Sequence, residues 1–242
     1  MIIGLIPSRL DSRRLKQKPL LIIDGLPIVV HAYKRAMLAK KLDKVIVCCD
    51  DKKIKDVVEK YGGDAILTSK KHKNGTERIF EVSKKFKAKL IVDIQGDEPL
   101  VDPKDIDAVI EFHKKQNFDI VVPCIKTLQP KNPNLVKVIF SKLGKVLYFS
   151  RHKMPFNFHD KKINYYKDLS IISFKPESLK KYCKMPMSPL EKIEGIELIR
   201  ALENDISIGT FAIKSKSFSV DVKGDLMKAI DVMPRDPVRK LY

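Results

Sequence analysis

The segment IIGLIPSRLDSRRLKQKPL, residues 2–20, is the stretch that decides the fold. It begins with a short apolar run, residues 2–7, and passes at once into a loop rich in arginine and lysine. Apolar runs of about four to eight residues bounded by a turn signal are typical of buried β-strands. Short apolar runs of the same kind recur at residues 45–49, 65–68, 90–94 and 120–124. We therefore expect five buried strands in the first half of the chain.

Amphipathic, lysine-rich segments separate these strands, at about residues 27–41, 52–61, 76–86 and 103–116, and we expect them to be helices. Strands that alternate with helices at this spacing are joined by right-handed crossovers and pair as a mostly parallel sheet. The sequence thus predicts an α/β fold. Ligands of such sheets bind at the carboxyl ends of the strands.

From about residue 132 the pattern changes. Residues 136–140 and 146–150 flank Leu143-Gly144, which indicates a hairpin and an extension of the sheet. A polar loop at 152–167 follows, then a strand at 168–174, helices at 176–183 and 188–203, a strand at 206–213 and a last helix at 222–232. Ser188 and Glu191 have the spacing of a capping box, which fixes the start of the longer helix. With no linker or repeat, the 242 residues are predicted to form a single domain.

Charge and composition narrow the class of protein. Lys and Arg total 48 against 30 for Asp and Glu, which gives a net charge of +18. The lysines lie in pairs on nearly every predicted helix, which favours solvated outer faces over a nucleic-acid-binding stripe. No stretch approaches about 18 uncharged apolar residues and no secretion signal is evident, so a cytoplasmic protein is expected. The four cysteines lack C-x-x-C spacing and indicate neither a zinc site nor a disulfide framework.

The loop that follows the first strand carries five cations within residues 8–18. At the ligand-binding edge of a sheet, arginine forks and a lysine point charge suit a polyphosphate, whose charge they offset. The loop lacks the Gly-x-x-x-x-Gly-Lys pattern of the P-loop. Taken alone, it is equally well read as a solvated basic loop.

A second polar group follows the strand at 90–94. Gln95 and Asp97 are two residues apart and share a face, with Gly96 between them to allow close backbone approach. Asp97 could simply cap the next helix. Beside a phosphate-binding loop, a hard-cation site becomes the better interpretation, because Mg²⁺ prefers one or two carboxylates together with phosphate oxygens.

Six blocks of sequence together resemble one known family. They are Arg9-x-x-Ser12-x-Arg14-Leu15-x-x-Lys18-Pro19-Leu20, Asn74-Gly75-Thr76-Glu77-Arg78, Gln95-Gly96-Asp97-Glu98-Pro99, Asn132-Pro133-Asn134-Leu135-Val136-Lys137-Val138, Leu147-Tyr148-Phe149-Ser150-Arg151 and Ser188-Pro189-Leu190-Glu191-x-Ile193-Glu194. Their order and spacing are similar to those of the 3-deoxy-manno-octulosonate cytidylyltransferases, the CMP-Kdo synthetases. The resemblance covers nearly the whole chain. It implies a Rossmann-like, mixed and mostly parallel sheet of the nucleotidyltransferase type with a small sheet-and-helix extension.

The resemblance also implies roles for individual residues. Nucleotide-binding positions would be Arg9, Ser12, Arg14, Lys18, Asn74, Gly75, Thr76, Arg78 and Gln95, with Lys18, Arg14 and Asp97 catalytic. Asp97 and Asp221 would hold Mg²⁺, and Arg151, Asp168, Glu197 and Arg200 would face the sugar. The nucleotide-binding part would span about 1–130, a sugar-binding and dimerisation extension about 131–213, and a C-terminal return 214–242. Glu197 and Arg200, at i and i+3, would share a helix face, although an ordinary surface ion pair is the alternative.

Some positions depart from the family pattern. Lys16 and Gln17 replace a Pro-Gly pair, so the phosphate loop is expected to take another path. On the sugar side, Asp168, Ser170, Ile172 and Leu198 stand where the family has other residues, and we expect a less polar and more anionic pocket there. His72, just before the Asn74-Gly75 turn, is expected to be solvated, with a place at the nucleotide edge as the alternative, and His31 to be partly buried.

The predicted reaction is transfer of CMP from CTP to an acidic sugar, with Kdo as the expected substrate and pyrophosphate as the second product. Its products would serve lipopolysaccharide or surface polysaccharide synthesis, and the protein would be a homodimer. One alternative changes the acceptor to an amino-substituted ulosonate or a nonulosonate, whose ammonium Asp168 would pair. The other is a basic paralogue that binds nucleotides or RNA without turnover, which steep salt sensitivity would reveal.

Overall fold

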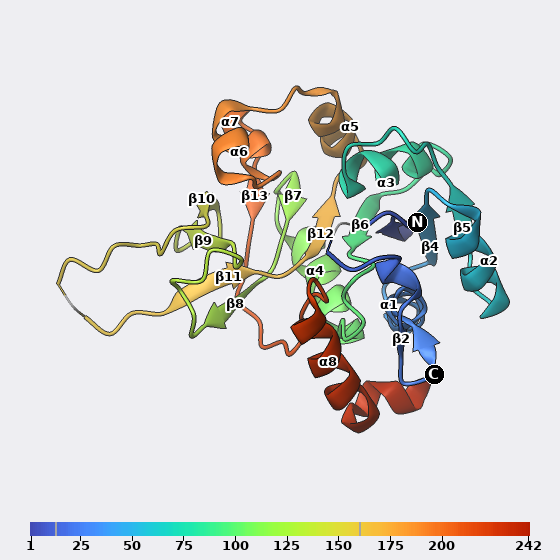
Figure 1. Cartoon of the computed structure of the whole chain (residues 1–242). Helices are drawn as coiled ribbons and strands as arrows, with labels where there is room; N and C mark the ends of the chain where they lie inside the picture. The colour runs from blue at the N-terminus through green and yellow to red at the C-terminus, as the bar shows by residue number, and fades with distance from the viewer. Residues whose placement is uncertain (13, 160) are drawn as a thin grey trace.

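The computed structural model describes residues 1–12, 14–159 and 161–242. Its centre is a large sheet of seven strands in the order β13-β7-β12-β6-β1-β4-β5 (Figure 1). The strands are β1 (Ile2–Ser8), β4 (Lys44–Cys49), β5 (Ala65–Leu67), β6 (Leu90–Ile94), β7 (Ile120–Val121), β12 (Ile171–Phe174) and β13 (Ile208–Gly209). β12 runs against both of its neighbours, and the remaining strands share one direction. The sheet is therefore mixed and mostly parallel, as the sequence predicts.

Helices cover both faces of this sheet. α1 (Ile28–Met37), α2 (Lys52–Lys60) and α4 (Pro103–Lys115) pack on one face, where Ile6 of β1 points. α3 (Gly75–Ser83), α5 (Pro176–Lys184) and α7 (Ile199–Glu203) pack on the other, where Ile3 and Leu5 point. The alternation along β1 places its apolar side chains in two separate cores. Three of these helices begin as their sequences predict, because Asp51, Asn74 and Asp102 accept hydrogen bonds from backbone N–H groups of the first turn.

The extension is a separate antiparallel sheet of order β10-β9-β11-β8. Its strands are β8 (Cys124–Thr127), β9 (Lys137–Phe140), β10 (Val146–Ser150) and β11 (Tyr165–Asp168). The predicted hairpin of β9 and β10 is confirmed, and Gly144 in its turn has a φ of +79°. Figure 1 shows this sheet projecting from one side of the large sheet.

Two predicted strands are each divided between the sheets. The run 120–124 forms β7 in the large sheet and β8 in the extension, and the run 168–174 contains only the end of β11 before β12 begins. Pro123 lies at the first break and accepts a bond from the N–H of Leu169 at the second, at 2.9 Å. Because Pro has no N–H, it cannot continue a ladder, and the paired ribbon changes sheets at this point.

The C-terminal half departs from expectation in two further places. The predicted helix 188–203 is α6 (Pro189–Glu194) followed by α7, because Gly195 has a φ of +62° and ends α6. The predicted strand 206–213 pairs in the large sheet only as β13. α8 (Lys223–Val232) and the 3₁₀ turns Met233–Arg235 and Pro237–Leu241 then return to α1 (Figure 1). Among the described helices, none combines the length and the apolar character that crossing a bilayer requires.

The start of the chain beyond β1 is short and irregular. A 3₁₀ turn at Lys18–Leu20 precedes the two-stranded hairpin of β2 (Ile22–Ile23) and β3 (Leu26–Pro27), which leads into α1. Ile23 and Ile28 of this region pack with Val220, Ala229 and Met233 in a third, smaller core. The C-terminal return is therefore joined to the same region that carries the cationic loop.

Candidate active site

A cavity of about 670 Å³ opens at the carboxyl ends of β1 and β6. Its walls are the loop after β1, the start of α3, the end of β6, and two segments from the second half of the chain. The predicted site residues that line it are Arg9, Ser12, Arg14, Lys18, Asn74, Gly75, Arg78, Gln95, Asp97, Glu197 and Asp221. Residues far apart in the sequence thus meet where the strand pattern places ligands. Arg13, another cation of the loop, lies outside the described residues.

The loop after β1 turns sharply just before Lys18. Gln17 adopts φ 50° and ψ 37°, the left-handed conformation that glycine takes most readily. Leu20 then donates its N–H to the Gln17 carbonyl at 2.9 Å, which closes the 3₁₀ turn. Gln17, which stands where the family pattern has glycine, thus adopts the backbone conformation that glycine favours. That Lys16 and Gln17 send the loop along another path than in the family stays a prediction.

Lys18 lies between the two predicted metal ligands. Its Nζ is 2.5 Å from Oδ2 of Asp97 and 3.2 Å from Oδ1 of Asp221. Arg14 Nη2 donates to the same Asp221 oxygen at 2.8 Å. The backbone supports this arrangement, since Val220 donates its N–H to the carbonyl of Asp97 at 2.9 Å. The C-terminal return is thereby aligned with the end of β6.

The residues fit the Mg²⁺ that the family implies. Asp97 and Asp221 both line the cavity with partly exposed carboxylates, and Lys18 and Arg14, which pair with them, would have to give up these contacts to an ion. Among residues 1–12, 14–159 and 161–242, no group of three or more His, Cys, Asp or Glu side chains forms a metal cage. Two carboxylates without a cage suit Mg²⁺, which completes its shell with water and substrate phosphates.

Two acids with raised pKa values lie at the cavity: Glu197 lines it, and Asp93, which the sequence did not point to, is buried at the end of β6. Asp93 of β6 is 1% exposed, and burial, with Glu197 and Asp97 nearby, raises its pKa well above the usual range. Gln95 donates its Nε2 to Asp93 Oδ1 at 3.0 Å. Glu197 accepts from the Thr76 hydroxyl at 3.0 Å, and burial also raises its pKa. Thr76 itself does not line the cavity. Its hydroxyl positions Glu197, which does.

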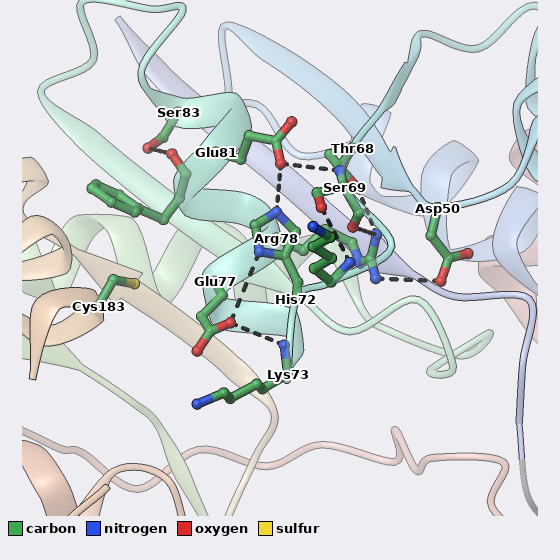
Figure 2. Close-up of polar contacts among 12 residues, drawn as sticks. Asp50, Thr68, Ser69, His72, Lys73, Glu77, Arg78, Glu81, Ser83 and Cys183 are labelled. Carbon is green, nitrogen blue, oxygen red and sulfur yellow. Dashed lines mark hydrogen bonds and ion pairs between the residues drawn. The ribbon is translucent and has the colours of Figure 1, made fainter. Parts of the chain in front are cut away.

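Arg78 joins three segments of the wall. It is 4% exposed and donates to the Thr68 hydroxyl at 2.5 Å, the Asp50 carboxylate at 3.3 Å and the Ser69 carbonyl at 3.4 Å (Figure 2). Asp50 in turn accepts from the N–H of Leu10 at 2.9 Å. Arg78 therefore fixes the loop after β1 relative to the loop before α3, and it also lines the cavity.

Three of the four predicted sugar-binding residues do not line the cavity. Arg200 is 4% exposed, with Nε and Nη2 on the carboxylate of Glu191 at 2.7 and 2.6 Å. Arg151 donates to the backbone carbonyls of Pro133, Glu194 and Gly195. Arg151 thus joins the end of β10 to the end of α6, and Arg200 joins α7 to α6. The predicted face shared by Glu197 and Arg200 does not form, because Glu197 precedes α7 in a turn.

Asp168 is the third of these residues. It ends β11, where it pairs in register with Cys124, and burial raises its pKa to about 6 against the opposing charges of Lys167 and Arg151. Ile172 and Leu198 pack in the core on the α3 side of the sheet. None of these three side chains lines the cavity, so the expected change in the polarity of the sugar pocket stays a prediction.

The structure places His72 as the alternative interpretation had it, at the edge of the cavity, and buries His31 more deeply than expected. His72 lines the cavity and its Nε2 lies 2.5 Å from the Glu81 carboxylate, so it is not simply solvated. His31 is fully buried between the Tyr242 hydroxyl and the Ile23 carbonyl, and burial lowers its pKa to about 4. The contact of His72 with Glu81 could have been suspected from the sequence, because two glutamates, Glu77 and Glu81, lie one turn apart on the helix that begins just after His72.

A cation-lined cavity beside a carboxylate pair, on a mostly parallel sheet, is the architecture of a nucleotidyltransferase. Residues 3–208 match the family model of the cytidylyltransferases, which gives the class. A 3-deoxy-manno-octulosonate cytidylyltransferase of Thermodesulfovibrio yellowstonii is 39% identical over 93% of this chain and 94% of its own length. One from Fusobacterium nucleatum is 37% identical over 98% of both chains.

Structural similarity agrees with these relatives. The structure of a CMP:2-keto-3-deoxy-manno-octonic acid synthetase complexed with CTP superimposes with a TM-score of 0.94, at 31% identity, over 97% of this chain and 98% of that one. The chain belongs to the 3-deoxy-manno-octulosonate cytidylyltransferase family.

Proposed function

We propose that this protein transfers CMP from CTP to 3-deoxy-manno-octulosonate, giving the CMP-sugar and pyrophosphate for lipopolysaccharide or surface polysaccharide synthesis. The observation that carries the proposal is the cavity at the ends of β1 and β6, where Arg14 and Lys18 contact the carboxylates of Asp97 and Asp221 and Arg9 lines the same cavity. The relatives and the CTP-complexed structure named above support the nucleotide and the acceptor.

The reaction requires positioning and charge neutralisation more than covalent chemistry. The anomeric hydroxyl of the sugar acid attacks the α-phosphorus in line, and pyrophosphate leaves with its bonding electrons. Arg9, Arg14 and Lys18 would hold the triphosphate and offset the charge that grows on the departing pyrophosphate. The Gln95 amide and the wall at Asn74 and Gly75 would hold the nucleoside part.

Asp97 and Asp221 would hold Mg²⁺. Bound there, the ion would neutralise phosphate charge and help to orient the α-phosphate. Lys18 shares both carboxylates, and it would exchange them for phosphate oxygens when CTP enters. This is consistent with a flexible lysine that acts as a point charge and does not depend on one fixed geometry.

On the acceptor side, Glu197 is the predicted residue that lines the cavity. We assign it to the sugar acid's hydroxyl groups, with its partly buried carboxyl held by the Thr76 hydroxyl. Arg151 and Arg200 would act indirectly, by fixing the segment 194–200 that carries Glu197. The amino-sugar alternative loses its support, because Asp168 pairs within the extension and lies away from the cavity lining.

We further propose that the protein is a homodimer through its extension and works in the cytoplasm, where CTP is available. The extension and the helices beside it carry large exposed apolar side chains, among them Leu143 (86%), Leu147 (56%) and Ile193 (79%). Apolar groups of this size on one part of a chain favour a protein partner over solvent.

The test is pyrophosphate release by the purified protein with CTP and a panel of sugar acids. We expect release with the octulosonate and Mg²⁺, loss on chelation of divalent ions, and a fall in kcat of at least about 100-fold in Asp97→Asn. Asp56→Asn, a change at an exposed position of α2, is the matched control and should retain activity. A folded protein that neither binds CTP nor releases pyrophosphate with any acid would refute the proposal.

A further inference from the structure

One wall of the cavity is a loop with no regular structure of its own. Residues 68–74 connect β5 with α3, and His72, Lys73 and Asn74 of this loop line the cavity. Ordering a loop residue costs about 1–2 kcal/mol of backbone entropy. If the loop were unordered before CTP arrived, binding would have to supply that cost. The contacts that order the wall in advance therefore contribute to nucleotide affinity.

Three side chains of α3 hold this loop from the helix side. Arg78 holds its first residues, as described above. Glu77 Oε2 accepts the N–H of Lys73 at 2.9 Å, and Asn74 Oδ1 accepts the N–H of Glu77 at 2.8 Å. Glu81 Oε2 accepts the N–H of Ser69 at 3.1 Å. Each contact comes from the first two turns of α3, so the helix start and the loop form one unit.

His72 lies between the two glutamates. Its Nε2 is 2.5 Å from Glu81 Oε2, and its Nδ1 is 3.9 Å from Glu77 Oε2 (Figure 2). The imidazole is 19% exposed, so the contacts are partly shielded from water. Desolvation opposes ionisation of Glu81, but the hydrogen bonds from His72 and the Ser69 N–H outweigh it and lower the pKa of that carboxyl. A charged acceptor strengthens the bond that His72 donates.

We propose that His72 is a positioning residue for the nucleotide: its bridge to Glu81 and Glu77 holds the wall 69–74 in the shape that receives CTP. The inference rests on the proposed function. His72 acts through the wall and takes no part in the transfer step. Loss of the bridge should therefore weaken CTP binding and leave the chemical step and the sugar site nearly unchanged.

The experiment compares His72→Ala, His72→Gln and Glu81→Gln by CTP titration calorimetry and by steady-state kinetics. A partly exposed, charge-assisted hydrogen bond corresponds to about a 10-fold change in affinity. We expect His72→Ala to raise the Kd and KM for CTP by about 10-fold, with kcat and the KM for the sugar acid within about 2-fold of wild type. His72→Gln places an amide nitrogen near the former Nε2 and should recover most of the affinity.

The double variant His72→Ala/Glu81→Gln separates an indirect role from direct contact with CTP. If His72 acts through Glu81, the double variant should bind CTP no more weakly than His72→Ala alone. Independent, multiplying effects would show that His72 contacts the nucleotide itself and would overturn the proposal. The proposal would also be overturned if His72→Ala lowered the Tm but left the affinity for CTP unchanged.

The wild-type measurement keeps the two proposals distinct. Wild-type protein that binds CTP but transfers CMP to no acid would contradict the proposed reaction, and the calorimetric comparison of the His72 variants would still decide the inference. Wild-type protein that does not bind CTP would refute both.

Discussion

At the scale of the residue, Gln17 carries the clearest conflict between local preference and the fold. A side chain in the left-handed region costs roughly 1–2 kcal/mol, and β-branched residues tolerate it least. The surrounding structure imposes the conformation, because the next residue, Lys18, must reach Asp97 and Asp221. The strain is thus located directly beside the charged group that the site needs.

This conflict gives a prediction with a built-in control. Gln17→Val should lower the free energy of unfolding by about 1–2 kcal/mol and reduce kcat/KM for CTP by about 10-fold, because it opposes the turn that directs Lys18. Gln17→Gly removes the strain but enlarges the entropy of the unfolded chain, so its stability should stay within about 0.5 kcal/mol of wild type, with normal kinetics. Urea unfolding and CTP kinetics measure both. Equal behaviour of the two variants would contradict the assigned role of the backbone.

The roles of the residues around the first strand could be predicted from the sequence, because these residues lie in short segments at the ends of neighbouring strands. The cations of one loop and the carboxylate after β6 are brought together by strand order alone. Arg151 and Arg200 could not be assigned in this way. Whether an arginine meets a substrate or a buried partner depends on tertiary contacts such as Glu191 to Arg200, which span the turn at Gly195 and leave no periodic signal.

At the scale of the element, apolar runs located most strands but not the sheets to which they belong. The run 120–124 reads as one strand, yet it contributes to two sheets because Pro123 interrupts the ladder. The helix 188–203 was predicted from its apolar positions, and Gly195 divides it through a positive φ that periodicity does not reveal. The α/β alternation of the first half was predictable because three of its four helices, α2, α3 and α4, are capped by a side chain just before them.

The first turn of α4 contains a buried acid that makes stability depend on pH. Asp105 is 6% exposed and its Oδ2 has no hydrogen-bond partner, and burial raises its pKa to about 6. The folded protein therefore holds this proton more tightly than the unfolded chain does. The contribution of protonated Asp105 to the free energy of unfolding is fully present below about pH 4 and is lost as the pH rises to about 6.

Asp105→Asn should remove this dependence. Between about pH 4 and pH 6 the wild type should lose up to about 3 kcal/mol relative to the variant, and the difference should stay constant above pH 6. Denaturant unfolding at a series of pH values from 4.5 to 8 measures it. A difference between the two proteins that does not change over this range would show that Asp105 is not protonated in the fold.

At the scale of the whole molecule, the last part of the chain completes a site that begins at the first strand. α8 follows directly after Asp221, and the turns beyond it lie against α1. Arg35 of α1 is 1% exposed, pairs with Asp236, and donates to the Tyr242 hydroxyl at 3.0 Å and the Val101 carbonyl at 3.3 Å. One buried guanidinium thus fastens the return to the body of the fold and fixes the position from which Asp221 reaches the cavity.

Breaking this attachment should affect both stability and the response to Mg²⁺. Arg35→Met removes a buried charge and leaves Asp236 without its partner, which costs about 3–5 kcal/mol of unfolding free energy. Because α8 is then held less firmly, the Mg²⁺ concentration for half-maximal activity should rise several-fold, while the KM for the sugar acid stays near wild type. Arg235→Met is the matched control: its pair with Asp231 is exposed, so the same substitution should cost less than about 1 kcal/mol and leave the Mg²⁺ response unchanged.

Thermal unfolding and activity at graded Mg²⁺ concentrations compare the two variants. If Arg35→Met unfolded more easily but kept the wild-type Mg²⁺ response, the C-terminal attachment would stabilise the fold without positioning Asp221.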